Sequence, residues 1–333
     1  MVTVGKHNSL LIIGTADSNN YRNDITYAER YKDVYNNYGD SPLTSAYETA
    51  YNAGAPHIFL MNCRQQYDIL NIGNTLRETD FTYIVPISVM LSDEFDEPNT
   101  ERRISYLEYL MEQIGAKNDS VFIATDKHAS LYEDIDTFIN DMNNISSIFK
   151  HKIRYPVVPE NIIFLANNLY NYDYPNVLLG AVLCNTELSK YPSYDFGEAY
   201  FNLDSYENID NWAYFQNHQL RSTTVENLIN YQEQGNPLKI HYISRIIKAI
   251  KRELDFDIFI GKRYTEYQRL SVEQYLDKYL QSILGSMIYD YNIVSVRPYR
   301  SLEPMCIDIE NVFEVWPLNC LEKVTLSKTV SVM

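Results

Sequence analysis

The hydrophobic positions in the first half of the chain form short apolar runs that alternate with amphipathic segments. A run at 82–91 contains Pro86, which favours an edge strand or a bulge. Four further runs are bounded by polar or turn residues, which is typical of buried strands: 9–14, 57–62, 120–125 and 161–167. Amphipathic segments predict helices over 27–38, 102–114 and 131–149. This alternation predicts a largely parallel sheet with helical crossovers.

One helix is marked at both ends by the sequence. Ser41 is a good N-cap, and Pro42 fits the first helical position. Leu43, Ala46, Tyr47 and Ala50 then recur at helical spacing, and Gly54 is suited to end the helix in a left-handed conformation. Because the apolar run at 57–62 follows, the stretch from 9 to 62 is predicted to be a βαβ unit.

The last hundred residues change to a different pattern. Two amphipathic helices are predicted over 240–254 and 270–283, the second ending at Gly285. Three strands follow, at 291–297, 306–316 and 322–332. The segment 185–237 is polar, rich in Tyr and Asn, and without a lasting period, so it is expected to be irregular and extended.

These patterns predict an α/β fold with a mixed sheet and βαβ units, followed by an α+β domain with an extended terminal strand. The expected parts are an N-terminal α/β part over 1–184, a connecting segment over 185–237 and a C-terminal domain over 238–333. A chain of 333 residues can bury roughly 75% of its unfolded surface, so a hydrophobic core needs no cross-links.

Composition and charge exclude several classes of protein. The formal net charge is −16 with a pI near 4.8, which argues against nucleic-acid binding because phosphates require clustered Lys and Arg. No apolar run reaches about 18 residues, and the apolar stretch near the N-terminus is too short for a signal peptide. We therefore expect a protein folded in the cytoplasm, without membrane insertion. The 30 tyrosines fit surfaces that become buried on assembly, or compositional drift in an AT-rich genome.

The sequence carries no catalytic motif. The glycines form neither GxGxxG nor a P-loop, there is no GxSxG, and the six histidines lack metal-ligand spacing. The four cysteines, Cys63, Cys184, Cys306 and Cys320, are predicted to be buried free thiols. We therefore predict no catalytic, cofactor-binding or metal-binding residues. An α/β enzyme whose site no motif reveals is the alternative.

One segment breaks the acidic character of the chain. Within 239–254, a single carboxylate, Glu253, accompanies five basic residues: Lys239, Arg245, Lys248, Lys251 and Arg252. Arg245, Lys248 and Arg252 share one helical face. Such a stripe predicts docking onto an acidic surface. The alternative is an ordinary solvated face with basic residues near a helix C-terminus.

The order of the C-terminal elements resembles that of contractile tail sheath proteins of phages and related injection machines. The shared features are a basic amphipathic helix, the connector "FDIFIGKRYTEYQRL", a long helix ending at Gly285, and strands that include "CLEKVTLSKTV". The N-terminal signature of that family is similar to Tyr38-Gly39, Ser41-Pro42-Leu43, residues 52–55 and the run 58–61. The helix "NVLLGAVL" (176–183) matches the small-residue helix before the C-terminal domain. The resemblance covers 9–63 and 176–333.

This resemblance implies a structural virion protein rather than an enzyme, with no cofactor. Sheath subunits form stacked six-membered rings around a tail tube and contract to drive the tube through the host envelope. The implied partners are further copies of the chain, the tail tube protein, and baseplate and tail terminator proteins. Assembly is expected in the host cytoplasm and the final location in the phage tail. A terminal-ring or adaptor protein related to sheaths is the alternative within the same family.

Two sets of residues follow from the resemblance as hypotheses. Lys239, Arg245, Lys248, Lys251 and Arg252 are expected to face an acidic tube. The alternating run "VTLSKTVSV" is expected to be a strand donated to a neighbouring subunit, through Val324, Leu326, Thr329, Val330 and Val332. Members of the family are typically longer and open with an arm around Pro-Gly-Val-Tyr, so a minimal sheath protein is expected here.

Overall fold

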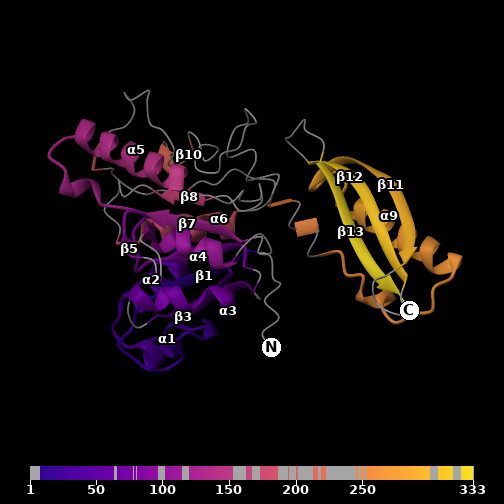
Figure 1. Cartoon of the computed structure of the whole chain (residues 1–333), viewed down its shortest axis with the longest axis horizontal. Coiled ribbons are helices and arrows are strands. Elements are labelled where there is room, and N and C mark those ends of the chain that lie inside the picture. Colours follow the sequence, from indigo (N-terminus) through magenta and orange to yellow (C-terminus); the bar gives the residue numbers. More distant parts are fainter. Residues whose placement is uncertain are drawn as a thin grey trace. The chain divides into compact units, whose positions relative to one another are not determined.

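A computed structural model of the chain describes a defined set of residues: 8–63, 66–77, 79, 81–96, 102–114, 120–152, 163–166, 173–186, 194, 200–201, 213–216, 219–222, 245–246, 249–250, 253–300, 307–317 and 324–332. Its internal contacts divide the chain into two units, Met1–His241 and Tyr242–Met333. They are called unit 1 and unit 2 below, and each is described by itself. Figure 1 shows both, coloured along the sequence.

Unit 1 is built on an eight-stranded mixed sheet with the order β10-β9-β8-β7-β4-β1-β3-β2. Its strands are β1 (Ser9–Gly14), β2 (Ile25–Tyr27), β3 (His57–Asn62), β4 (Tyr83–Pro86), β7 (Val121–Thr125), β8 (Ile163–Ala166), β9 (Ala213–Gln216) and β10 (Gln219–Ser222). All pairings from β3 to β9 are parallel, and β2 and β10 close the two edges in antiparallel pairs. The predicted α/β class with a mixed sheet is confirmed.

Helices cover this sheet, as Figure 1 shows. They are α1 (Tyr31–Tyr38), α2 (Pro42–Asn52), α3 (Gly73–Arg77), α4 (Tyr106–Ile114), α5 (Ile135–Lys152) and α6 (Pro175–Asn185), with short 3-10 turns η1 (Gln66–Asn71) and η3 (Ala129–Leu131). A two-stranded sheet joins β5 (Glu94–Asp96) to β6 (Arg103–Ser105). Helix α2 packs on β1 and β3, whereas α6 crosses β1, β4, β7 and β8.

The core of unit 1 surrounds the central strands and includes α6 among the helices packed on them. Every residue of β1 is buried. Parallel strands that are covered on both faces are typically continuous apolar runs, as the sequence of β1 is. Residues 175–184 of α6 are buried as well, and Gly180 allows the closest approach to the sheet. A Cβ atom there would lie 2.8 Å from Leu10 Cδ1, 3.2 Å from Val85 Cγ2 and 3.3 Å from Ile123 Cδ1. The close packing of α6 on the sheet therefore requires a residue without a side chain at position 180.

The ends of α2 agree with the sequence. The Ser41 hydroxyl accepts a hydrogen bond from the Thr44 amide (3.3 Å), and Pro42 occupies the first helical position. After the helix, Gly54 has a φ of +82°, a conformation that glycine adopts without steric cost. Local signals of this kind are independent of the rest of the fold, which explains why the prediction for 41–54 is confirmed.

The structure differs from the sequence predictions where short strands form. Residues 25–27 pair with β3, so the helix expected over 27–38 begins at Tyr31. Residues 103–105 pair with β5, so the helix expected from 102 begins at Tyr106. The segment 185–237 was expected to be irregular, but it supplies β9 and β10 to the main sheet. These strands are only three or four residues long, and distant partners rather than local patterns stabilise them.

Unit 2 contains a three-stranded antiparallel sheet with the order β11-β12-β13. Its elements are η4 (Asp257–Phe259), α9 (Glu266–Ile283), β11 (Ile288–Arg300), β12 (Ile307–Pro317) and β13 (Val324–Val332). Thr265 caps α9 by accepting from the Gln268 amide (3.2 Å), and Gly285 follows the helix with a φ of +79°. The three predicted strands are confirmed; β11 extends beyond its expected range at both ends, and β12 is shifted by one residue.

The two faces of this sheet differ in burial. In β12, Ile309, Asn311, Phe313 and Val315 are buried, while the residues between them are partly exposed. Tyr291 pairs with Val315 and therefore shares its face, and its hydroxyl donates to Asp277 Oδ1 of α9 at 2.8 Å. Helix α9 thus covers the inner face of the sheet. The outer face carries Asp308, Glu310, Val312, Glu314 and Trp316.

A tyrosine ties α9 to the residues before η4. The Tyr279 hydroxyl donates to Glu253 Oε2 (2.9 Å), and burial together with this bond raises the pKa of Tyr279 above its ordinary value of 10.0. A raised pKa in the folded state stabilises unit 2 fully below pH 10. This contribution is lost as the pH rises above 10, because the tyrosine of the unfolded chain then ionises first.

We expect Tyr279→Phe to lower the unfolding free energy of unit 2 by about 1 kcal/mol at pH 7 and to make its decline above pH 10 less steep. Urea unfolding of the full chain measures this, with Trp212 replaced by Phe so that fluorescence reports on Trp316 of unit 2. Tyr267→Phe is the matched control, because Tyr267 lies on the same helix and is 74% exposed. An unchanged alkaline slope in the Tyr279 variant would refute the assignment.

Candidate functional site

The topological switch point of the unit 1 sheet lies at the carboxyl ends of β1 and β4. The order β3-β1-β4 reverses the direction of chain winding there, and open α/β sheets bind ligands at such switch points. In this chain the position is filled by its own side chains. A Cβ atom on Gly14 would lie 2.7 Å from Ile87 Cδ1 and 3.1 Å from Leu43 Cδ1. The described residues therefore pack against one another where a substrate would bind.

Buried asparagines complete this packing. Asn176, at the start of α6, donates from Nδ2 to the carbonyl oxygen of Pro86 at 3.1 Å. Asn62, at the end of β3, accepts from the Ala16 amide at 3.0 Å and donates to the carbonyl oxygen of Ser18 at 2.8 Å. Both side-chain amides form hydrogen bonds with buried backbone groups that would otherwise have no hydrogen-bond partner. They have a structural role at the switch point.

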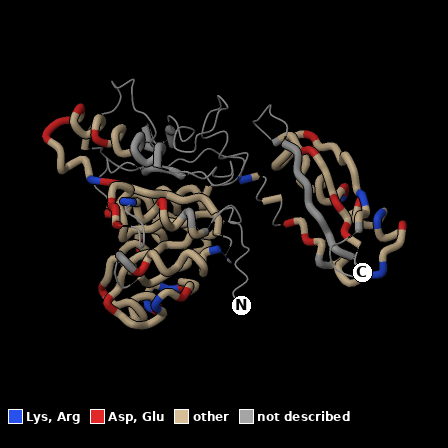
Figure 2. Tube along the Cα trace, viewed as in Figure 1, with Lys and Arg blue, Asp and Glu red and all other residues tan. Residues whose placement is uncertain are grey.

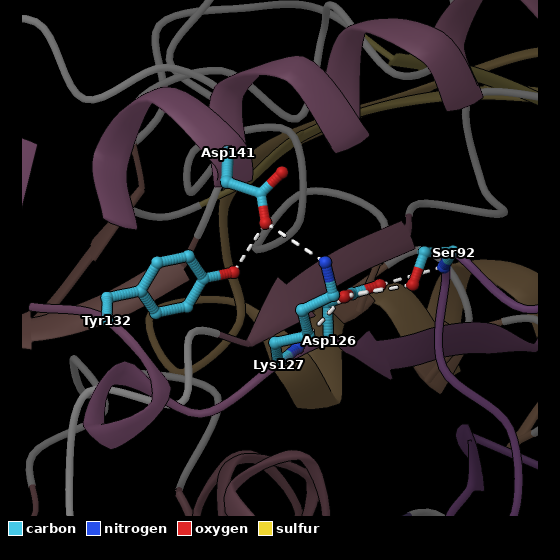
Figure 3. A network of polar contacts seen from close by, with 5 residues as sticks. All are labelled: Ser92, Asp126, Lys127, Tyr132 and Asp141. Atoms are coloured by element: carbon cyan, nitrogen blue, oxygen red, sulfur yellow. Dashed lines mark hydrogen bonds and ion pairs between the residues drawn. The ribbon is translucent and has the colours of Figure 1, made fainter. Parts of the chain in front are cut away.

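A polar network follows β7 and is drawn in Figure 3. Asp126 accepts from the Ser92 amide (2.7 Å) and from the Ser92 hydroxyl (3.0 Å), while Lys127 Nζ lies 3.2 Å from Asp141 Oδ2. Tyr132 donates to the same Asp141 oxygen, and burial followed by this bond raises the pKa of Tyr132. A phenol with a raised pKa is a poor proton donor at neutral pH. The network fixes two loops to α5 rather than preparing a catalytic acid.

The thiols and histidines of the described residues have identifiable surroundings. Cys63 and Cys184 are free and buried as predicted, and burial raises the pKa of Cys63 to about 12, which keeps it protonated. His128 accepts from the Ser130 amide, and His57 lies beside the Tyr27 hydroxyl. Within the described ranges, no group of three His, Cys, Asp or Glu residues could hold a metal ion. The positions of Cys306 and Cys320 lie outside them.

The predicted donated strand is β13, with the bounds Val324–Val332. In a single copy it pairs with β12 and forms one edge of the sheet: Val324, Leu326, Thr329, Val330 and Val332 are opposite Val315, Phe313, Glu310, Ile309 and Ile307. The side chains of β13 lie outside the described residues. Its donation to a neighbour stays a prediction, and within one copy its pairing partner is β12.

The predicted basic stripe requires one correction. Arg245 is only 4% exposed in the folded chain, so it does not belong to an accessible basic surface. The apolar residues around it in the sequence explain this burial, because Ile246, Ala249 and Ile250 are buried too. Lys239, Lys248, Lys251 and Arg252 lie outside the described residues, and their expected role stays a prediction.

Two surfaces of unit 2 were missed by the sequence reasoning. One is the outer face of β12, where acidic residues recur at alternate positions: Asp308, Glu310 and Glu314. The other is the turn around η4, where Ile258 and Ile260 are 50% and 53% exposed and Lys262 and Arg263 follow. The alternation of acidic and apolar residues in "IDIENVFEVW" could have indicated the acidic face of β12. For the second, no local pattern distinguishes exposed from buried isoleucines.

No protein-family description and no curated protein sequence matches the chain. Among solved structures, the fold is similar to a sheath tail protein from Desulfitobacterium hafniense, with 8% identity, a TM-score of 0.57, and coverage of 98% of this chain and 97% of that one. A sheath tail protein from Listeria innocua matches with 10% identity, a TM-score of 0.51, and coverage of 98% and 95%.

A third similar structure is the helical sheath of the anti-feeding prophage in its contracted state. It has 10% identity and a TM-score of 0.53, and the alignment covers 100% of this chain and 92% of that chain. The resemblance stated from the sequence is thereby confirmed at the level of the fold. The alignments extend over nearly the whole chain and so include 64–175, which the sequence resemblance did not cover.

Proposed function

We propose that this chain is the subunit of a contractile tail sheath, which polymerises as stacked rings around a tail tube. The observation that carries the proposal is the similarity of the complete fold to sheath proteins, with more than nine-tenths of each chain aligned. The packed switch point of unit 1 agrees with a structural role.

The sheet of unit 2 offers the means of linking copies. Among the described strands, β11 and β13 lie at the two edges of this sheet, and edge strands can accept or donate a strand. If β13 of one copy were donated to a neighbour, it could pair with the neighbour's β12 in the same register that it has with β12 of its own chain. Links of this kind persist while subunits rotate, because they depend on backbone hydrogen bonds rather than on the position of unit 1.

Contraction would draw its free energy from surface buried between subunits in the short state. At roughly 25 cal/mol per Å² of apolar surface, a few hundred Å² per subunit supplies several kcal/mol before ordering costs. Many subunits that switch together multiply this amount. The basic residues Lys239, Lys248, Lys251 and Arg252 are proposed to face the tube, and tail tube, baseplate and terminator proteins are the proposed partners in a virion. In the described part of the chain, no helix is both long and apolar enough to cross a membrane.

Self-assembly is the first test of the proposal. Purified chain, concentrated with and without its tube protein, is expected to form striated tubes in negative stain and to pellet in proportion to its concentration. Discrete rings would instead favour a sheath-related terminal or adaptor protein. If the chain stays monodisperse at all concentrations even with the tube protein present, self-assembly is refuted. The remaining hypothesis is then an α/β enzyme.

A further inference from the structure

The outer face of the unit 2 sheet is an acidic surface with an apolar centre. Asp308, Glu310 and Glu314 lie on it with Val312 and Trp316, all partly exposed. Asn292 of β11 donates from Nδ2 to Glu314 Oε2 (3.1 Å), Arg297 is opposite Glu310, and the β13 positions opposite this face are Ser or Thr. Figure 2 shows acidic residues along this sheet.

The turn around η4 has the complementary character. Phe256 and Phe259 each pack edge-on against Tyr275 of α9, with ring centroids 5.6 Å apart, and Lys262 Nζ lies 5.3 Å from the Phe259 ring. These contacts hold the turn in place, so Ile258 and Ile260 are exposed on a fixed support. Exposed Lys262 and Arg263 follow immediately. Apolar side chains on a rigid support are well suited to bind a partner at low entropic cost.

The two surfaces lie on opposite sides of unit 2. The turn belongs to the helical layer through Tyr275, and the bond from Tyr291 to Asp277 shows that α9 covers the inner face of the sheet. Glu314 and its neighbours point away from that layer. The acidic face of a copy is therefore out of reach of its own turn and open to the turn of another copy.

We propose that residues 256–263 of one copy dock on the outer face of β12 of a second copy. Lys262 and Arg263 would meet the carboxylates of Asp308, Glu310 and Glu314, and the two isoleucines would cover Val312 and Trp316. Because the two surfaces differ and face opposite ways, the contact is head-to-tail and propagates along an open polymer. The inference rests on the proposed sheath function and gives it a specific contact between subunits.

Charge reversal tests this contact. Lys262→Glu with Arg263→Glu, and separately Glu310→Lys with Glu314→Lys, should each raise the critical concentration for pelleting at least about tenfold at low salt, because like charges would meet. An equal mixture of the two variants restores both kinds of contact, and so does the chain with all four changes. Both should return to within about threefold of the wild-type value, since the opposite charges are paired again.

Two further variants guard against effects on folding. Lys278→Glu reverses the charge of an exposed α9 residue that belongs to neither proposed surface and should leave the critical concentration unchanged. Ile258→Ser with Ile260→Ser removes only exposed apolar surface and should raise it. If wild-type tubes form but the charge swaps fail to restore assembly, or the serine variant assembles normally, the contact is wrong and the sheath proposal stands. A wild-type chain that never assembles overturns both.

Discussion

Deleting residues 323–333 is expected to abolish tube formation while unit 1 stays folded. The deletion removes the whole of β13, a strand with β12 as its one partner in the sheet. Unit 1 has its own core around β1 and α6, which the deletion does not touch. Electron microscopy should show no tubes, and far-ultraviolet circular dichroism should retain the helices of unit 1. Normal tubes from the shortened chain would refute the role of the strand.

A disulfide between β12 and β13 shows whether the strand is donated. Glu310 and Thr329 are opposite each other, so cysteines at both positions can be oxidised across the pair. Within assembled tubes, a donated strand yields a covalent ladder of copies on a non-reducing gel. A strand that stays in its own chain yields only monomers. Glu310→Cys without Thr329→Cys is the matched control and should give no ladder.

Gly180→Val is expected to lower the unfolding free energy of unit 1 by about 3 kcal/mol. Even a Cβ atom at this position would lie under 3 Å from Leu10, and a valine adds two methyl groups between Leu10, Val85 and Ile123. Overpacking of this kind displaces side chains in a core that has no spare volume. Urea unfolding followed by circular dichroism measures the loss.

An exposed position on a neighbouring helix provides the control. Glu48→Val on α2 introduces the same side chain at a solvent-exposed site and should change the unfolding free energy by no more than about 0.5 kcal/mol. Equal stability of the Gly180 and Glu48 variants would contradict the close packing of α6 on the sheet.

Most of the fold could be predicted from the sequence where local signals were strong. The buried runs of β1, β3 and β7 and the capped helix α2 each follow from their own residues, whereas α6 was expected from the resemblance to sheath proteins. Strands β2, β6, β9 and β10 could not be predicted. Three or four residues are too few to show a hydrophobic periodicity, and these strands are stabilised by pairing with segments far away in the sequence. The order of the sheet also depends on contacts between segments far apart in the chain.

The candidate surfaces were predicted less completely. The bounds of β13 follow from its alternating pattern, and the structure places the strand at a sheet edge. Arg245 was assigned to a basic stripe by helical spacing, but spacing does not reveal which face of a helix is covered. The turn at Ile258 and Ile260 shows the same limit, because only the aromatic contacts of Phe256 and Phe259 determine which side chains are left exposed.

Electron cryomicroscopy of the native particle tests the sheath role most directly. The account predicts many copies of this fold stacked in rings around an inner tube. Lys239, Lys248, Lys251 and Arg252 should face the tube, and β13 should pair with β12 of an adjacent copy. A single ring of this chain at one end of a tail would contradict its role as the main sheath subunit. A particle that lacks the chain altogether would contradict the sheath assignment itself.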